Sequence, residues 1–147
     1  MEPYIFKTKV LWSQIDSNNH LRHSAYADLA CQCRVEVLEH LNITSTLMMG
    51  LNIGPILFEE KTVYKREVPP NNLVTVTCKL ATSRIDAARY TFEQEIYRAD
   101  GILAAIVTVT GAWMNLETRK LCIPPTAFAE KILTSMPKTK DCNIYDS

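Results

Sequence analysis

The spacing of apolar residues changes twice in the first third of the chain. From residue 4 to residue 12 apolar and polar positions alternate, which predicts a strand. From Ser24 to Leu41 the apolar positions recur at three- and four-residue steps, which predicts a long amphipathic helix that stops at Asn42. The apolar face of the strand comprises Tyr4, Phe6, Val10 and Trp12, and that of the helix comprises Tyr26, Leu29, Ala30, Cys33, Val37 and Leu41.

Alternation returns after an irregular segment over residues 43–55, where Gly50 and Gly54-Pro55 are loop signals. Asp100-Gly101 is a strong hairpin signal between the last two of the strand-like runs that follow. The final run is apolar on nearly both sides, which predicts a strand in the middle of a sheet. These four runs cover residues 56–68, 73–82, 88–98 and 102–114.

Proline opens the last predicted helix, and a polar segment ends the chain. Pro124-Pro125 precedes a short helical pattern with Phe128, Ile132 and Leu133 as its apolar stripe. Residues 138–147 carry no clear pattern and predict a flexible tail. The order of one strand, one long helix and four antiparallel strands predicts an α+β layer architecture, with a five-stranded antiparallel sheet against one long central helix. We expect one domain over residues 1–137.

Composition narrows the class of protein. The chain has 147 residues, is 47% hydrophobic and carries no formal net charge, so it can build one core and nothing in its charge suggests a surface for nucleic acid or anionic membranes. Its five cysteines contain no CxxC pair, and such an odd, scattered set is typical of a reducing compartment. Neither a signal peptide nor a membrane-spanning run is evident, so we expect a cytoplasmic protein without membrane insertion.

Only the loop between the first strand and the long helix suggests chemistry. It carries Asp16 and His20, and the helix begins a few residues later. The first backbone N–H groups of a helix have no partner within it, so they can stabilise a developing oxyanion while a nearby carboxylate attacks or activates water. The alternative is that Asp, Ser and Asn in this loop merely cap the helix.

The ordered set Trp12, Asp16, His20 and Tyr26, in this succession of elements, resembles the hotdog-fold acyl-CoA thioesterases of the 4-hydroxybenzoyl-CoA thioesterase-like family. In that family a sheet wraps around a central helix. The resemblance covers roughly residues 4 to 130. Further similar positions are Arg34, Tyr64-Lys65-Arg66, the Phe92–Glu95 strand, Asp100-Gly101 and Ile123-Pro124, whereas Gln14, Asn19, Arg22-His23 and Cys31-Gln32 depart from the family pattern.

The resemblance implies an acyl-CoA thioesterase that releases a free acid and CoA. Asp16 would be the nucleophile or general base, the backbone N–H groups of Ser24 and Ala25 would form the oxyanion hole, and His20 would orient the loop. Tyr26 would line the acyl channel. Basic residues that would bind the phosphates of CoA, unless they are ordinary surface charges, are Arg84, Arg89, Arg119 and Lys120.

The same resemblance predicts a homodimer or homotetramer with a site at the subunit interface, acting on an acyl-CoA or an acyl-carrier-protein substrate. It implies no cofactor beyond the CoA of the substrate. Asp16, His20 and His23 are too few and too close in sequence to predict a metal site. Two other classes stay open: an enoyl-thioester hydratase or dehydratase using Asp16 and His20, and a non-catalytic acyl-thioester-binding protein.

Overall fold

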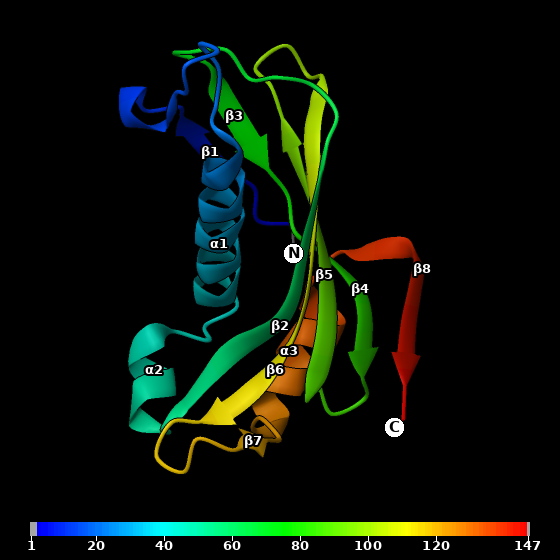
Figure 1. Ribbon diagram of the computed structural model, residues 1–147. Coiled ribbons are helices and arrows are strands. Elements are labelled where there is room, and N and C mark those ends of the chain that lie inside the picture. Colours follow the sequence, from blue (N-terminus) through cyan, green and yellow to red (C-terminus); the bar gives the residue numbers. More distant parts are fainter. Residues whose placement is uncertain (1–2, 147) are drawn as a thin grey trace.

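The computed structural model describes residues 3–146 of the chain, in which a curved sheet lies beside one long helix (Figure 1). Within these residues, no helix is both long enough and apolar enough to cross a membrane. In chain order the elements are β1 (Phe6–Lys9), η1 (Trp12–Gln14), α1 (His23–His40), α2 (Ser45–Gly50), β2 (Ile53–Tyr64), β3 (Leu73–Val76), β4 (Lys79–Arg84), β5 (Arg89–Tyr97), β6 (Leu103–Asn115), β7 (Leu121–Cys122), α3 (Thr126–Ser135) and β8 (Lys138–Tyr145).

Strand β6 is the centre of the sheet. It pairs antiparallel with β2 on one side and with β5 on the other. Strand β5 then pairs with both β3 and β4, which in turn pair with β1 and β8. The apolar run over residues 102–114 was predicted to lie in the middle of a sheet, and this prediction is confirmed. Strand β2 pairs with β6 alone among the described strands, so its other side is an edge of the sheet.

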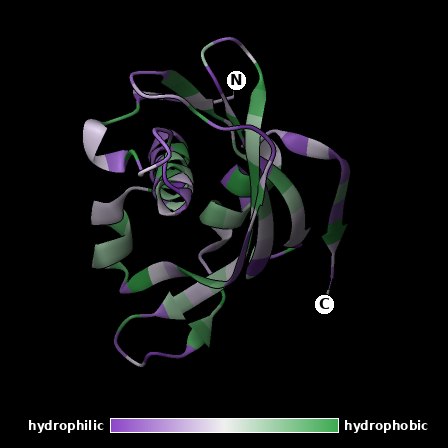
Figure 2. Cartoon of the chain, turned by 45° about the horizontal axis from the view of Figure 1, so that its top comes forward, coloured by the Kyte–Doolittle hydropathy of each residue, from purple (hydrophilic) through white to green (hydrophobic). Residues whose placement is uncertain are grey.

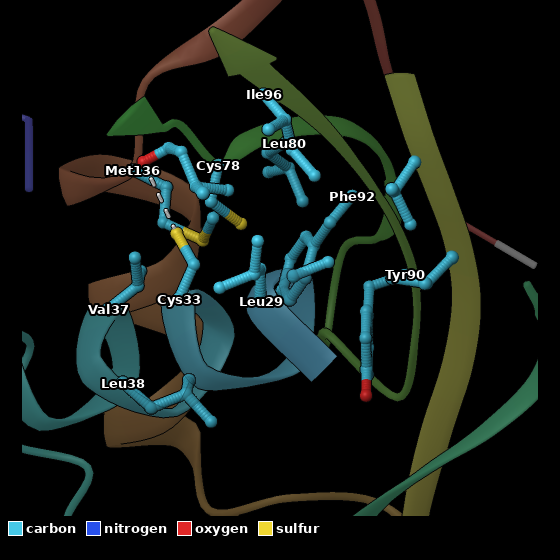
Figure 3. Close-up of a cluster of buried hydrophobic side chains, with 14 of the residues drawn as sticks. Leu29, Cys33, Val37, Leu38, Cys78, Leu80, Tyr90, Phe92, Ile96 and Met136 are labelled. Atoms are coloured by element: carbon cyan, nitrogen blue, oxygen red, sulfur yellow. Dashed lines mark hydrogen bonds between the residues drawn. The ribbon is translucent and has the colours of Figure 1, made fainter. Parts of the chain in front are cut away.

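The core fills the space between α1 and the concave face of the sheet. Every residue of the predicted apolar face of the helix is buried, and so are Val74, Val76, Cys78 and Leu80. Figure 3 shows Leu29 and Cys33 of α1 beside Leu80 and Phe92 of the sheet. Asn42 adopts a left-handed φ of 62° just after α1, which explains why the helix stops there.

Over residues 3–146 the sheet contains eight strands rather than the predicted five. The run over residues 73–82 is broken, so that β3 and β4 pair with different parts of β5. Residues 138–147 were predicted to form a flexible tail, whereas Lys138–Tyr145 forms β8, which runs parallel to β4. Figure 2 shows that β8 is mostly hydrophilic. Such a strand follows an exposed edge and is held by backbone hydrogen bonds, so hydrophobic spacing does not reveal it.

Two predictions near the N-terminal half are wrong in detail. Trp12 does not end the first strand, because β1 stops at Lys9 and Trp12, a residue that is 78% exposed, begins a 3₁₀ turn. The segment over residues 43–55 is not wholly irregular, because Ser45–Gly50 forms α2. The Thr44 side chain accepts a hydrogen bond from the Leu47 N–H at 3.1 Å, which caps that helix.

Candidate active site

A tight loop places Asp16 in front of α1. The loop is closed by a bridge between Ile15 and Leu21, and the Asp16 N–H donates to the His20 carbonyl at 2.9 Å. Asn19 has a φ of 62°, a left-handed conformation that asparagine tolerates. Leu21 is buried, and its N–H donates to the Val68 carbonyl at 2.8 Å. This bond joins the loop to the segment that follows β2.

The two oxygens of the Asp16 carboxylate have different surroundings. Oδ1 accepts from the Asn18 N–H at 2.9 Å and from the His20 N–H at 3.4 Å. Oδ2 lies 3.7 Å from His20 Nδ1, which is too far for a good hydrogen bond. Asp16 therefore stabilises its own loop through one oxygen and keeps the other available. The N-cap position of α1 is Arg22, and its side chain makes no capping hydrogen bond. Asp16 is therefore not the capping residue of this helix.

His20 lies between two carboxylates. Its Nδ1 faces Asp16, and its Nε2 lies 3.6 Å from Glu67 Oε2, on the segment after β2. The His20 side chain is 28% exposed and that of Glu67 is 69% exposed, so water screens this pairing. The arrangement suits a residue that orients Asp16.

These groups line a cavity of about 330 Å³ at the N-terminal end of α1. Tyr26 and Tyr64 meet edge to face across it, with ring centroids 5.1 Å apart. Burial, and then the neighbouring Tyr64, Asp16 and Glu67, raise the pKa of Tyr26, so its hydroxyl stays protonated and can donate. The lining residues are Asp16, His20, Leu21, His23, Tyr26, Tyr64, Lys65, Arg66 and Glu67.

The first turn of α1 carries two candidate backbone donors, one on His23, which lines this cavity, and one on the adjacent Ser24, which does not. Within the described part of the chain, the N–H groups of His23 and Ser24 donate to no acceptor. The Ala25 N–H, by contrast, donates to the Arg22 carbonyl at 3.0 Å, and Ala25 is buried. The structure therefore does not support Ala25 as an oxyanion donor, because a bonded N–H is not free to bind a substrate oxygen. The candidate oxyanion donors in this turn are therefore the N–H groups of His23 and Ser24.

Sequence reasoning missed the contribution of the segment that follows β2. The sequence alone assigned no role to Glu67, and Lys65 and Arg66 entered only as positions that resemble the family. The Leu21–Val68 hydrogen bond brings this segment beside Asp16. No local pattern predicts such a contact, because the two segments are more than forty residues apart.

Arg84 and Arg89 line a different cavity of about 190 Å³, away from Asp16. The Arg84 Nη2 atom lies 2.6 Å from Asp86 Oδ2, while its buried Nε atom has no hydrogen-bond partner among residues 3–146. The Arg89 guanidinium stacks over the Phe58 ring at 4.9 Å from its centroid. One arginine is therefore already partly neutralised, and the other is held against an aromatic ring.

Arg119 and Lys120 lie in the exposed turn between β6 and β7. Neither lines the cavity of Asp16 or that of Arg84. Over residues 3–146, no group of three or more His, Cys, Asp or Glu side chains is arranged to hold a metal ion.

Comparison with known proteins gives the family. The model of the thioesterase-like superfamily matches residues 10–132 of the chain. A search of curated proteins gave no significant match.

Several solved structures share the fold. The chain is similar to the hypothetical protein SAV2348 from Staphylococcus aureus in complex with CoA, with a TM-score of 0.86 and 21% identity over 95% of this chain and 89% of that one. It is also similar to the 1,4-dihydroxy-2-naphthoyl-CoA thioesterase Slr0204 from Synechocystis, with a TM-score of 0.80 and 12% identity over 91% and 98%. A DHNA-CoA thioesterase from Staphylococcus aureus gives a TM-score of 0.75 and 18% identity over 81% and 78%.

The fold and the family model define a hotdog-fold thioesterase. The chain belongs to the thioesterase-like superfamily. The α+β hotdog architecture predicted from the sequence is confirmed, and so is the predicted class, a thioester hydrolase. The roles of individual residues and the substrate stay predictions.

Proposed function

We propose that the protein is an acyl-CoA thioesterase that hydrolyses its substrate to a free acid and CoA at the Asp16 cavity. One observation carries the proposal: the free oxygen of Asp16 lines the same cavity as the first turn of α1, in a chain of the thioesterase-like superfamily. The structural neighbours that bind CoA or act on CoA thioesters support an acyl-CoA substrate.

The reaction needs a proton acceptor or nucleophile and a donor for the carbonyl oxygen. In one route, water attacks the thioester carbon while Asp16 Oδ2 takes its proton; in the other, Oδ2 attacks directly and water then hydrolyses the anhydride. In both routes the Ser24 N–H binds the oxyanion, the C–S bond breaks, and the thiolate of CoA leaves. One such donor typically contributes roughly 3 kcal/mol to the transition state.

His20 and Tyr26 have supporting roles in this proposal. His20, held between Asp16 and Glu67, orients the carboxylate, and the neutral Tyr26 hydroxyl donates a hydrogen bond to the substrate. Arg84 and Arg89, which line one cavity, bind the phosphates of CoA through their guanidinium groups. Arg119 and Lys120 would add only long-range attraction, because they are exposed and line neither cavity.

The assembly we propose is a dimer in which β2 pairs with its own copy. A twelve-residue edge strand is an aggregation hazard unless something covers it. Exposed apolar side chains on it are Leu57, Phe58, Val63 and Tyr64. An antiparallel pairing centred on Glu60 would place Glu59 opposite Lys61 of the partner subunit, and the reverse. In that register two pairs of opposite charge flank a central pair in which Glu60 faces its own copy, so the two flanking ion pairs have to offset one repulsion between like charges.

Thiol release from a panel of short, long and aromatic acyl-CoAs tests the proposed function. The panel is offered to the wild type, to Asp16→Asn and to Asp28→Asn. Asp28 is a matched control, because it is an exposed carboxylate on α1 that does not line the Asp16 cavity. We expect Asp16→Asn to lose activity by several hundredfold or more, within the range of 10²–10⁴ typical of general acid–base catalysis, and Asp28→Asn to lose less than about threefold.

Two results would contradict the proposal. Equal activity of Asp16→Asn and the wild type would remove Asp16 from the chemistry. Absence of thiol release on every substrate would reject hydrolysis, and consumption of an enoyl-CoA without thiol release would then identify a hydratase. Circular dichroism and the melting temperature show that the variants are folded.

A further inference from the structure

A second cavity of about 330 Å³ lies between α1 and the edge strand β2. Its floor is buried and consists of Leu38, Tyr90 and Phe92. Figure 3 shows Leu38 on α1 and the Tyr90 and Phe92 side chains on β5. Its rim is exposed and consists of Cys31, Val35, Pro55 and Leu57. The cavity therefore opens at the edge of the sheet, beside the outer side of β2.

Arg34 is the only charged residue among those that line this cavity. Its Nη1 donates to Oε1 of the fully buried Gln94 at 2.9 Å, and Gln94 Nε2 donates to the Ala30 carbonyl at 2.9 Å. The guanidinium is thus held in place by a neutral amide. Among the described residues no carboxylate lies within 4.0 Å of the Arg34 guanidinium, whereas each of the five ion pairs elsewhere in residues 3–146 involves an arginine or a histidine.

A guanidinium has five N–H donors, and Gln94 occupies one of them. The remaining donors suit the planar, bidentate geometry of a carboxylate. Tyr90 adds a neutral hydroxyl at the floor, since burial raises its pKa to about 12. An apolar space with one positioned cation fits a ligand that has an apolar body and an anionic far end.

The dimer proposed above places this cavity beside the Asp16 cavity of the partner subunit. Pro55 and Leu57 lie near the start of β2, and Tyr64 lies at its end beside the Asp16 cavity. When two copies of β2 pair antiparallel, the start of one strand lies opposite the end of the other. The acyl group of a thioester bound at one Asp16 can then enter the apolar cavity of the other subunit.

We propose that this apolar cavity binds the acyl group and that Arg34 selects acyl groups with a terminal carboxylate. The inference rests on the proposed thioesterase function and names the class of its substrate, an ω-carboxyacyl thioester. Arg34 does not touch the reacting atoms, so it is a specificity-determining residue and not a catalytic one.

Two matched pairs of substrates test the inference: adipoyl-CoA against hexanoyl-CoA, and 4-carboxybenzoyl-CoA against benzoyl-CoA. Within each pair the substrates differ only in the terminal carboxylate. We expect the wild type to favour the carboxylated member of at least one pair by about tenfold or more in kcat/KM. We expect Arg34→Gln to abolish that preference mainly through the carboxylated member, and Arg34→Lys, which keeps the charge, to retain part of it.

Other outcomes overturn the inference. One is that the wild type hydrolyses hexanoyl-CoA and benzoyl-CoA as well as, or better than, their carboxylated counterparts. Another is that Arg34→Gln lowers kcat/KM equally for both members of a pair. A third is that the wild type releases thiol only from acyl-CoAs outside the two pairs. Absence of thiol release from all acyl-CoAs would instead reject the proposed function. Binding of adipoyl-CoA and hexanoyl-CoA to Asp16→Asn, measured by calorimetry, makes the same comparison without turnover. Size-exclusion chromatography of Arg34→Gln shows whether the variant keeps its assembly state.

Discussion

The two cavities along α1 have the same volume, about 330 Å³, and opposite chemistry. The cavity at the N-terminal end is lined by Asp16, His20 and Glu67, and most of its charged groups sit on loops. The cavity farther along the helix is lined by apolar residues of α1, β2 and β5, with Arg34 as its one charge. In the first cavity the loops can therefore supply reactive groups, while in the second the helix and the sheet supply a binding space of fixed shape.

This difference shows how one helix can serve two tasks. Its first turn exposes backbone N–H groups to a polar site, and its middle presents side chains to an apolar one. Because a thioester has a polar reacting end and a variable acyl end, the two cavities match the two ends of such a substrate.

The strongest test of the polar cavity removes a single backbone donor. Proline is tolerated in the first turn of a helix but has no N–H, so Ser24→Pro deletes the proposed oxyanion donor. We expect kcat to fall by about 10²–10³, as for other oxyanion-hole donors. Ser24→Ala keeps the N–H and removes only the hydroxyl, so its kcat should stay near that of the wild type. Equal kcat values for the two variants would exclude this donor.

Alkaline pH tests the buried side chains on the apolar side of α1. Burial raises the pKa of Cys33 from 9.0 to about 11 and that of Tyr90 from 10.0 to about 12. The unfolded chain therefore loses these protons first, and the stability that the buried neutral groups contribute is full below pH 9 and is lost as the pH rises towards 12. Each two-unit shift corresponds to about 2–3 kcal/mol.

Chemical denaturation at pH 8, 10 and 11 measures this loss. Cys33→Ala should flatten the slope of unfolding free energy between pH 9 and 11, whereas Cys31→Ala should not, since Cys31 is exposed. The same slope in Cys33→Ala as in the wild type would contradict the assignment.

Filling the apolar cavity should restrict the acyl group and leave the chemistry intact. Cys31→Trp places a large ring at the rim, and we expect kcat/KM for six-carbon and aromatic acyl-CoAs to fall by about tenfold or more, with a much smaller effect on acetyl-CoA. Gln32→Trp is the control, because the neighbouring Gln32 does not line the cavity. An equal loss on acetyl-CoA would show a defect outside acyl binding.

The smallest expected effect concerns the register of β2. Lys61→Glu would set two glutamates against each other at each of two symmetric positions, and we expect the dimer dissociation constant to rise about tenfold. Glu59→Lys combined with Lys61→Glu restores opposite charges and should restore the affinity. Sedimentation velocity at several concentrations measures both. A double variant as weak as the single one would reject this register, and a wild type that stays monomeric at micromolar concentration would reject the dimer.

Much of the fold could be predicted from the sequence, because the buried faces of α1 and of the long strands follow regular periods. Polar strands such as β8 could not be predicted, since their pairing depends on an open edge of the sheet that is formed elsewhere in the chain.

Of the site, Asp16 and His20 could be identified because they lie in one loop before a helix. Glu67 could not, because a contact through Leu21 and Val68 brings it there. Gln94 was also missed: a buried glutamine occupies an apolar face because Arg34 and the Ala30 carbonyl satisfy its amide.

The central claim is that one catalytic site combines the Asp16 cavity of one subunit with the apolar cavity of its partner. A purified heterodimer of Asp16→Asn and Cys31→Trp, made with two affinity tags, tests it with six-carbon acyl-CoAs. In such a heterodimer one site receives both defects and the other receives neither, so the account predicts about half of the wild-type activity per dimer. The Asp16→Asn homodimer should be nearly inactive, and the Cys31→Trp homodimer should be about tenfold or more less active than the wild type. Activity no higher than that of the two homodimers would contradict the account, because both cavities would then belong to the same subunit.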